Sequence, residues 1–358
     1  MQWFSKLFEA LLSRGYISSK NDHFLFTKST GSSLVVLVVY VDDILLAGDN
    51  LVEMNGLKSF LDAQFKIKDL GLVHYFLGLE ISSHPASYVM HHHKYTSDLL
   101  AEFKCSHFTP VATPLDSSLK LSTDMGDLLP EPSTYRRLIG KPNFLQHAIS
   151  DISYSVQHLS WFLQSPRIPH MLVGLHVLRY LSSAPAQGIL LPACPDFFLM
   201  AYSISDSASC AFSRRSVTWF YVTLEYRVLR QVVAEVSWLV RLLGDLGLPI
   251  NSHVPVFCDS QTALHIAKNP VFHERTKYIE IDFHYVCDYL NSDFITLQHV
   301  SSSAQLADIM TKALPGPLHH SLLGKLGVFS LTILGGKGGG GRKSYHWPII
   351  RLYSRPKY

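Results

Sequence analysis

The sequence predicts a multidomain α+β protein, and three observations support this fold class. The chain has 358 residues, of which 47% are hydrophobic and 16% charged, so it can form two or three separate cores. Apolar runs with lengths typical of strands and hairpins occur at 34–48, which is rich in Val and Leu, and at 254–258. Between residues 134 and 183, apolar residues recur instead at helical spacing.

The first elements are predicted to be two helices and a series of hairpins. Apolar residues at helical spacing predict an amphipathic helix over 3–14, and a second helix is expected over 51–64. A short strand is expected around Phe24–Phe26, followed by a Ser/Gly-rich turn and a hairpin over 34–48. Another strand pair is predicted between Leu70 and Ile81.

The middle of the chain is predicted to be helical and to contain one long loop. A helix is expected over 95–103. Residues 106–133 are rich in Pro, Ser, Thr and Asp, which is typical of a connecting loop. Three helices are predicted to follow, over 134–147, 151–164 and 168–183. Pro185 and Gly188 then indicate a boundary.

Strands and helices alternate again from about residue 198. Strands are predicted at 198–203, 217–224, 254–258 and 295–300. Helices are predicted at 225–246, 260–267, 280–290 and 304–312. The tail from Thr332 contains a Gly-rich run and no periodicity, so it is expected to be disordered.

Bulk properties exclude few function classes. The net charge of +3 permits nucleic-acid binding without indicating it. Five cysteines without CxxC spacing argue against a zinc site or a disulfide framework and favour an intracellular location, with cytoplasm and nucleus not distinguished. The first residues lack the apolar core of a signal peptide, and no membrane partner is expected. The run His91–His93 is expected to be a surface stretch, with metal binding as the alternative.

The segment Tyr40-Val41-Asp42-Asp43 is the most informative one in the chain. Its two carboxylates interrupt an apolar run and are predicted to lie at the tip of the hairpin. Charges in a buried stretch are costly unless they are neutralised, and a divalent cation is a common partner. The alternative is a solvent-exposed turn between two strands, which these four residues by themselves favour.

The surrounding segments resemble the reverse transcriptase of copia-type LTR retrotransposons, particularly those of plants. They match in order and spacing over residues 1 to about 82: Trp3-Phe4, Asn21–Phe26, Tyr40–Asn50 (YVDDILLAGDN), 57–71 (LKSFLDAQFKIKDLG) and Tyr75–Ile81 (YFLGLEI). The resemblance implies that residues 1–82 are the C-terminal part of the polymerase palm.

The same resemblance implies roles for single residues. Asp42 and Asp43 would be catalytic and would bind the Mg²⁺ ions of a two-metal phosphoryl transfer. Residues 75–81 would form the primer-grip hairpin. Tyr40 and Gly78 would contact nucleic acid, and the partners would be an RNA template and a DNA primer.

One departure from the family bears on activity. The family's palm has a further metal-binding aspartate on a strand upstream of its motif B, whereas this sequence starts at the end of motif B, at Gln2-Trp3-Phe4. An incomplete metal site fails to position and compensate the charges of phosphoryl transfer. We therefore expect a truncated segment of a Pol polyprotein that is inactive as a polymerase on its own, with the remainder of the polyprotein as a candidate partner.

Residues 83–196 resemble the thumb and connection region of the same family. Arg136 and Arg137 are candidates for contacts with the phosphates of a template–primer duplex. Helix packing with basic residues at the surface is the alternative.

Residues 197–326 resemble the family's RNase H domain. The matching segments are SRRSV (213–217), EYR (225–227), 256–282 and QLADIMTKALPG (305–316). The resemblance implies that Glu225, Asp259 and Asp308 are catalytic carboxylates that hold two Mg²⁺ ions and cut the RNA of an RNA–DNA hybrid. Each of these residues also has a purely structural interpretation. Glu225 and Asp259 would be stabilised near helix N-termini by the helix dipole, and Asp308 would be a solvated helix residue.

Further candidates and two departures complete this region. The family context implies that His273, Arg275 and Lys277 contact the nucleic-acid backbone, with solvated loop residues as the alternative. The family's first-strand aspartate is replaced by Ile204, and Asp206 is a weaker substitute as a metal ligand.

The second departure is that Glu225 directly follows the strand predicted at 217–224, where the family continues with another strand. We expect a degenerate RNase H-like α/β domain that lacks this strand, followed by the tail 327–358. Residual RNase H activity and a non-catalytic nucleic-acid-binding remnant are the alternatives.

Overall fold

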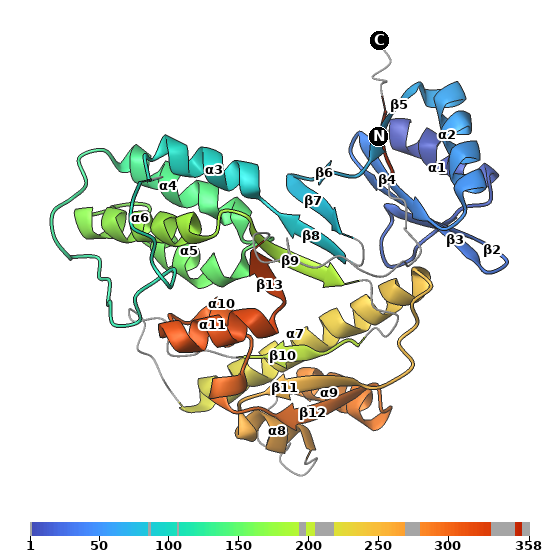
Figure 1. Ribbon diagram of the computed structural model, residues 1–358. Coiled ribbons are helices and arrows are strands. Elements are labelled where there is room, and N and C mark those ends of the chain that lie inside the picture. The colour runs from blue at the N-terminus through green and yellow to red at the C-terminus, as the bar shows by residue number, and fades with distance from the viewer. Residues whose placement is uncertain are drawn as a thin grey trace.

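The computed structural model describes residues 2–84, 87–105, 107–192, 198–204, 218–268, 280–330 and 348–352. Its architecture is mixed α+β, as the sequence predicts at this coarse level. The described residues form three sheets, each with its own helices (Figure 1). None of the helices in these ranges is long and apolar enough to cross a membrane.

The first sheet lies near the N-terminus. Its strands, in spatial order, are β1 (Ile17–Ser18), β2 (Leu25–Thr30), β3 (Ser33–Tyr40), β4 (Asp43–Gly48), β14 (Pro348–Leu352) and β5 (Ile67–Leu72). Two helices cover it, α1 (Gln2–Ser13) and α2 (Leu51–Phe65). Buried and less buried residues alternate along β3, so one face of this strand packs into the core.

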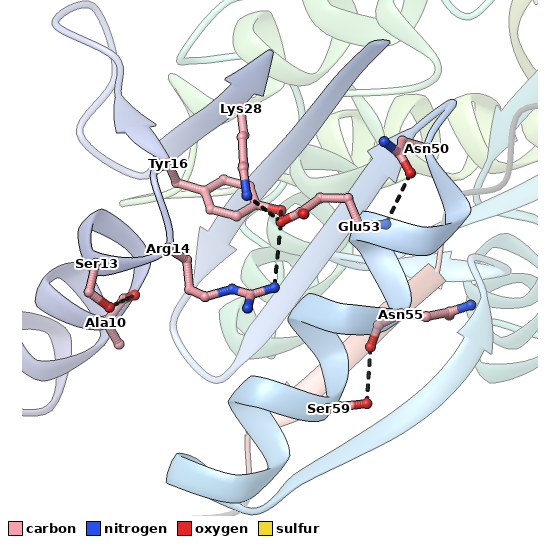
Figure 2. Close-up of polar contacts among 9 residues, drawn as sticks. All are labelled: Ala10, Ser13, Arg14, Tyr16, Lys28, Asn50, Glu53, Asn55 and Ser59. Atoms are coloured by element: carbon pink, nitrogen blue, oxygen red, sulfur yellow. Dashed lines mark hydrogen bonds and ion pairs between the residues drawn. The ribbon is translucent and has the colours of Figure 1, made fainter. Parts of the chain in front are cut away.

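Glu53 ties α2 to the segments around it (Figure 2). Its carboxylate lies 2.8 Å from Lys28 Nζ and 3.7 Å from a guanidinium nitrogen of Arg14. The Tyr16 hydroxyl donates to it at 3.4 Å. The Asn50 side chain accepts a hydrogen bond from the Glu53 backbone N–H at 3.0 Å and so caps the first turn of α2.

In the view of Figure 1, the second sheet lies between the N-terminal sheet and a layer of helices. The strands, in spatial order, are β13 (Val328–Ser330), β9 (Gln187–Pro192), β8 (Ser87–His91), β7 (Leu79–His84) and β6 (Tyr75–Phe76). The helices are α3 (His93–Glu102), α4 (Pro132–Leu145), α5 (Ser153–Ser160) and α6 (Ile168–Ser183). Gly188 permits the close approach of β8 and β9, because a Cβ there would lie 2.2 Å from the Met90 carbonyl oxygen.

The third sheet is parallel and has the strand order β10 (Ala201–Ser203), β11 (Val254–Cys258) and β12 (Ile295–His299). The helices of this region are α7 (Thr218–Asp245), α8 (Gln261–Lys268), α9 (Glu280–Asn291), α10 (Asp308–Thr311) and α11 (Gly316–Lys325). Leu229 and Val233 of α7 share one core with Val254 and Val256 of β11, and α7 contacts the neighbouring strand β10.

Three sequence predictions are wrong in this part of the chain. Residues 218–224 are the first turns of α7 and not a strand: their β-branched and aromatic residues favour a strand, but no Gly or Pro separates them from the helix. The helix predicted over 304–312 is reduced to the short α10. The tail predicted to be disordered contains β14 at Pro348–Leu352. The strands β9 and β13 and the helix α11 are additional to the prediction.

Candidate nucleic-acid and metal site

The carboxylates of Asp42 and Asp43 lie at the tip of the β3–β4 hairpin, as the sequence predicts. Tyr40 pairs with Asp43 across the hairpin, which leaves Val41 and Asp42 as the loop. Val41 is 67% exposed and has a φ of 51°, which is uncommon for a β-branched residue. Asp42 is exposed and Asp43 is half-buried.

The base of this hairpin is rigid, which gives its tip a fixed position. Leu37, Val39, Ile44 and Leu46 are all 2% exposed or less and belong to the core under α1 and α2. The strands therefore carry an exposed and a half-buried carboxylate, Asp42 and Asp43, on a closely packed support, an arrangement suited to holding a charged ligand.

The ligand set for Mg²⁺ is incomplete in the part of the chain that the structure describes. Mg²⁺ prefers oxygen ligands in octahedral geometry. Asp42 and Asp43 supply two carboxylates, but no group of three His, Cys, Asp or Glu residues among the described ones could hold a metal ion. The position opposite Asp43 in the sheet is taken by a basic residue, Arg351 of β14. The described residues thus do not by themselves fit a two-metal centre.

The hairpin of β6 and β7 is shaped by contacts within the protein. Gly78 has a φ of 86°, and a Cβ at this position would lie 2.3 Å from the Phe144 ring. Its carbonyl oxygen is 2.9 Å from Nδ1 of His92. Tyr75, at the start of the hairpin, is 62% exposed. The packing of the hairpin against Phe144 of α4 explains why position 78 requires glycine. The predicted contact of Gly78 with nucleic acid remains a prediction.

The histidine run at the end of β8 is only partly a surface stretch: the prediction is wrong for His91 and His92, whereas His93 is exposed. His91 and His92 are 5% and 1% exposed. His91 is hydrogen-bonded to the Ser82 hydroxyl at 3.0 Å, and the ring of His92 packs against Phe144 with centroids 4.9 Å apart. Burial lowers the pKa of both imidazoles. These contacts are tertiary, so the local sequence gives no signal for them.

Arg136 and Arg137 are exposed on α4, and both have partners within the protein. Arg136 Nε donates to the Leu163 carbonyl at 2.9 Å, and Arg137 Nε lies 3.2 Å from a carboxylate oxygen of Glu102. These contacts agree with the alternative interpretation, in which both arginines are basic surface residues of a packed helix. Phosphate binding by either residue remains a prediction, in which the exposed part of the guanidinium would serve as the donor.

The predicted RNase H carboxylates are only partly brought together. The carboxyl ends of β10 and β11 lie side by side, since Ser203 pairs with Cys258 in the parallel register. This register places Ile204 next to the half-buried Asp259 at one edge of the sheet. The side chain of Gln305 donates to the Ser203 carbonyl at 3.0 Å and so brings the chain before α10 to the same edge.

Asp308 is buried, so the alternative interpretation of this residue as a solvated helix residue is wrong. It is 3% exposed, and its Oδ1 atom lies 2.9 Å from Nζ of Lys312. The ammonium group of Lys312 therefore already compensates the negative charge of the Asp308 carboxylate, which a bound metal ion would otherwise compensate. Glu225 lies in α7, and its side chain is outside the described part, as are Asp206, His273, Arg275 and Lys277.

An apolar hollow of about 310 Å³ lies between β10 and α7, on the outer side of the third sheet. Leu199 and Ala201 line it from the strand side, and Val232, Val236 and Leu239 from the helix. β10 is the edge strand of this sheet among the described residues. The hollow thus adjoins an edge strand, and the lack of a further strand there remains a prediction.

A buried polar cluster was missed by sequence analysis. The Asp151 carboxylate accepts hydrogen bonds from the Tyr180 hydroxyl and, at 3.3 Å, from Nε2 of Gln187. Nε2 of His319, on α11, lies 3.3 Å from the same carboxylate. Burial, aided by the Asp151 charge, raises the pKa of Tyr180. The four residues come from four separate segments, so no spacing in the sequence could have revealed the cluster.

Comparisons with known proteins agree with the N-terminal resemblance. Residues 1–117 match the family described as reverse transcriptase (RNA-dependent DNA polymerase). Over 352 residues the chain is 34% identical to the Retrovirus-related Pol polyprotein from transposon RE2 of Arabidopsis thaliana, a match that covers 92% of this chain and 24% of that protein. The corresponding polyprotein from transposon RE1 of the same plant is 33% identical over 348 residues, with 91% and 24% covered.

A shorter relative is matched almost in full. The uncharacterized mitochondrial protein AtMg00810 of Arabidopsis thaliana is 31% identical over 224 residues, which are 56% of this chain and 93% of that protein. The chain spans about a quarter of the length of the two Pol polyproteins. No solved structure is significantly similar to it.

Proposed function

Because the chain belongs to the reverse transcriptase region of copia-type retrotransposon Pol polyproteins, we propose that it is a nucleic-acid-binding segment of such a polymerase. Reverse transcriptases bind a template and a primer and typically use Mg²⁺. The observation that carries the proposal is the β3–β4 hairpin, whose exposed tip bears Asp42 and Asp43 above a buried base. This hairpin lies inside the matched range 1–117.

The proposed units are a palm segment at 1–82, a thumb and connection at 83–196, an RNase H-like unit at 197–326 and a tail at 327–358. Three sheets with separate cores support a division into three units. The boundaries need adjustment, because the second sheet joins β6 and β7 to β8, β9 and β13. The middle unit therefore draws strands from 75–84 and 328–330 as well.

We propose further that a polypeptide of these 358 residues does not extend a primer. When bound, Mg²⁺ would supply charge compensation and an activated hydroxyl. Asp42 and Asp43 provide two carboxylates for it, and the described residues offer no third protein ligand beside them. Their role in this segment is to present negative charge at a fixed point of the surface.

We also propose that the RNase H-like unit does not cleave the RNA of an RNA–DNA hybrid. Ile204 stands at the end of β10, and Lys312 pairs with Asp308, so two of the predicted metal ligands are lost or engaged. A residual nuclease is the second candidate, favoured by one observation: Asp259 and the chain that leads to Asp308 meet at the same edge of the third sheet.

Two assays on the full chain test these proposals. Fluorescence anisotropy with a labelled RNA–DNA hybrid is expected to show binding that weakens with salt and survives Asp42→Asn and Asp259→Asn. Absence of binding at low salt would refute the proposed function. A primed RNA template with Mg²⁺ is expected to remain unextended, and extension would contradict the proposed inactivity. Cleavage of the hybrid that is lost in Asp259→Asn would establish the residual nuclease instead.

A further inference from the structure

The N-terminal sheet contains one strand from the other end of the sequence. β14 lies between β4 and β5 and pairs antiparallel with both (Figure 1). Ile350 is opposite Ile44 on one side and Asp69 on the other. Because β14 is antiparallel to each neighbour, β4 and β5 run parallel to one another, and α2 connects them. The two strands therefore flank a position that is one strand wide.

Backbone hydrogen bonding shows why this position needs an occupant. β4 carries the fully buried residues Ile44 and Leu46, so its backbone is fixed in place by the core. Without β14, the N–H and C=O groups along its outer edge would lack partners, which is costly in a partly buried strand. A fixed strand with an open edge is a template for another strand.

β5 depends on the same occupant for a different reason. Of its six residues only Ile67 packs against the N-terminal core, and the others are exposed. Side-chain links from α2 reach β5 at Ile67, whose N–H donates to the Asp62 carboxylate at 3.1 Å, and at Asp69, which forms an exposed ion pair with Lys58 at 2.8 Å. Such exposed pairs contribute little. Pairing with β14 is therefore the main link between β5 and the sheet.

We propose that β4 and β5 together form a strand-acceptor site, which binds one extended peptide antiparallel to both strands, and that Pro348–Leu352 of the same chain is its occupant. In this mode of recognition, main-chain hydrogen bonds supply most of the affinity. The occupant's sequence suits a strand, because Ile349 and Ile350 are β-branched and Pro348 stands at the first position, where a missing N–H is tolerated.

The site adjoins the hairpin that carries the carboxylates. Arg351 stands at the register position of Asp43, so the occupant brings a basic residue level with the Asp42–Asp43 tip. An occupied site thus places the C-terminal segment beside the candidate functional site. The inference concerns peptide binding, and its test contains no nucleic acid, so it stands or falls separately from the proposed function.

Hydrogen exchange measured by mass spectrometry on the full chain tests the site. The substitution Ile350→Pro removes one N–H and is incompatible with a central strand, whereas Ile350→Val keeps both the N–H and the strand preference. In the Pro variant, amides of 43–48 and 67–72 are expected to exchange about tenfold faster or more, while those of β7–β9 are unchanged. Ile350→Val is expected to behave like the parent chain. Unchanged exchange in the Pro variant would overturn the proposal.

A synthetic peptide of residues 345–354 then tests acceptance in trans. Added to the Ile350→Pro chain, it is expected to restore protection of 43–48 and 67–72 in a saturable manner. The same peptide with the Ile350→Pro change is expected to have no effect. Failure of the unmodified peptide to restore protection would show that the position is not an acceptor site.

A cysteine pair covers the case in which the Pro variant loses protection throughout. Leu45 and Ile349 are directly opposite in the register, and the distance between opposite Cα atoms in antiparallel strands permits a disulfide. Leu45→Cys with Ile349→Cys is expected to form this disulfide on mild oxidation, as mapped by peptide mass spectrometry. Leu45→Cys with Ile350→Cys, whose side chains would point to opposite faces, is the matched control. Equal yields in the two variants would overturn the proposal.

Discussion

Nε2 of His319 lies 3.3 Å from Oδ2 of Asp151 in the interior of the protein, and this contact joins the C-terminal helix α11 to the middle unit. Both side chains are almost entirely buried. The Tyr180 hydroxyl donates to the same carboxylate, and its ring packs edge-on against His319 with centroids 5.6 Å apart. The contact therefore belongs to a polar network inside an apolar surround, where every lost partner is costly.

Removal of the Asp151 carboxylate is expected to destabilise the protein strongly. Asp151→Ala leaves the buried Tyr180 and Gln187 without their shared acceptor and removes the carboxylate beside His319, and the expected loss is about 3 kcal/mol in the free energy of unfolding. Asp151→Asn keeps one acceptor oxygen and should lose less. Urea unfolding measures both. A loss below about 1 kcal/mol for Asp151→Ala would show that the network contributes little.

The stability of the middle unit is expected to fall in mild acid because of His170. Its Nδ1 accepts from the Arg167 N–H at 3.0 Å, and its Nε2 lies 3.0 Å from the Ser122 carbonyl, so the neutral ring satisfies both contacts. Burial lowers the pKa of His170 below the ordinary value of 6.5. The unfolded chain thus binds more protons, and this contribution to stability is present above pH 6.5 and is lost as the pH falls below it.

Unfolding free energies measured at several pH values check this expectation. His170→Gln keeps polar atoms near both partners but does not titrate, so its stability should decline less between neutral pH and mild acid than that of the parent chain. An identical pH dependence in the two proteins would rule out His170 as the titrating group responsible.

Gly78→Ala is expected to cost more stability than Gly71→Ala. Both glycines have positive φ angles, 86° and 78°, so both substitutions incur backbone strain of about 1 kcal/mol. At Gly78 the new methyl group would also lie 2.3 Å from the Phe144 ring, which adds about 1–3 kcal/mol. At Gly71 nothing lies within 4 Å. Equal losses in chemical denaturation would indicate that Phe144 moves away freely.

Binding of an RNA–DNA hybrid is expected to depend on salt and on exposed arginines. If three phosphates are neutralised, affinity falls about 40-fold from ~50 to ~200 mM salt. Arg137→Gln should reduce this slope by about one unit if the guanidinium contacts a phosphate. Lys141→Gln is a matched control, because Lys141 is a second basic partner of Glu102 on the same helix. Equal slopes in the parent chain and in Arg137→Gln would assign Arg137 to the packing of α4 alone.

Elements with a clear local sequence pattern, such as the β3–β4 hairpin and the longer helices, could be predicted from the sequence. The β3–β4 hairpin follows from an apolar run interrupted at Asp42 and Asp43, and α2 agrees with the helix predicted over 51–64. The placement of the two carboxylates at the tip could therefore be predicted from residues 34–48. Long helices such as α6 were found for the same reason, because their periodicity extends over several turns.

Non-local pairing accounts for most of what the sequence did not reveal. β9, β13 and β14 are short, and each is stabilised by strands distant in sequence, so no periodicity marks them. His91 and His92 are buried by tertiary packing, in which His91 is hydrogen-bonded to Ser82 and Nδ1 of His92 to the Gly78 carbonyl. The roles predicted for Glu225, Asp259 and Asp308 rest on the resemblance and remain predictions.

The position of β13 has a consequence for synthesis on the ribosome. β13 pairs with β9 and so completes the sheet of the middle unit, and His319 reaches Asp151 from the helix just before it. The middle unit therefore cannot finish folding when residue 192 has emerged, but only after residue 330 has been made. Until then the outer edge of β9 and the buried carboxylate of Asp151 lack their final partners. We expect nascent chains that stop between these two points to be bound by chaperones and to be sensitive to proteases.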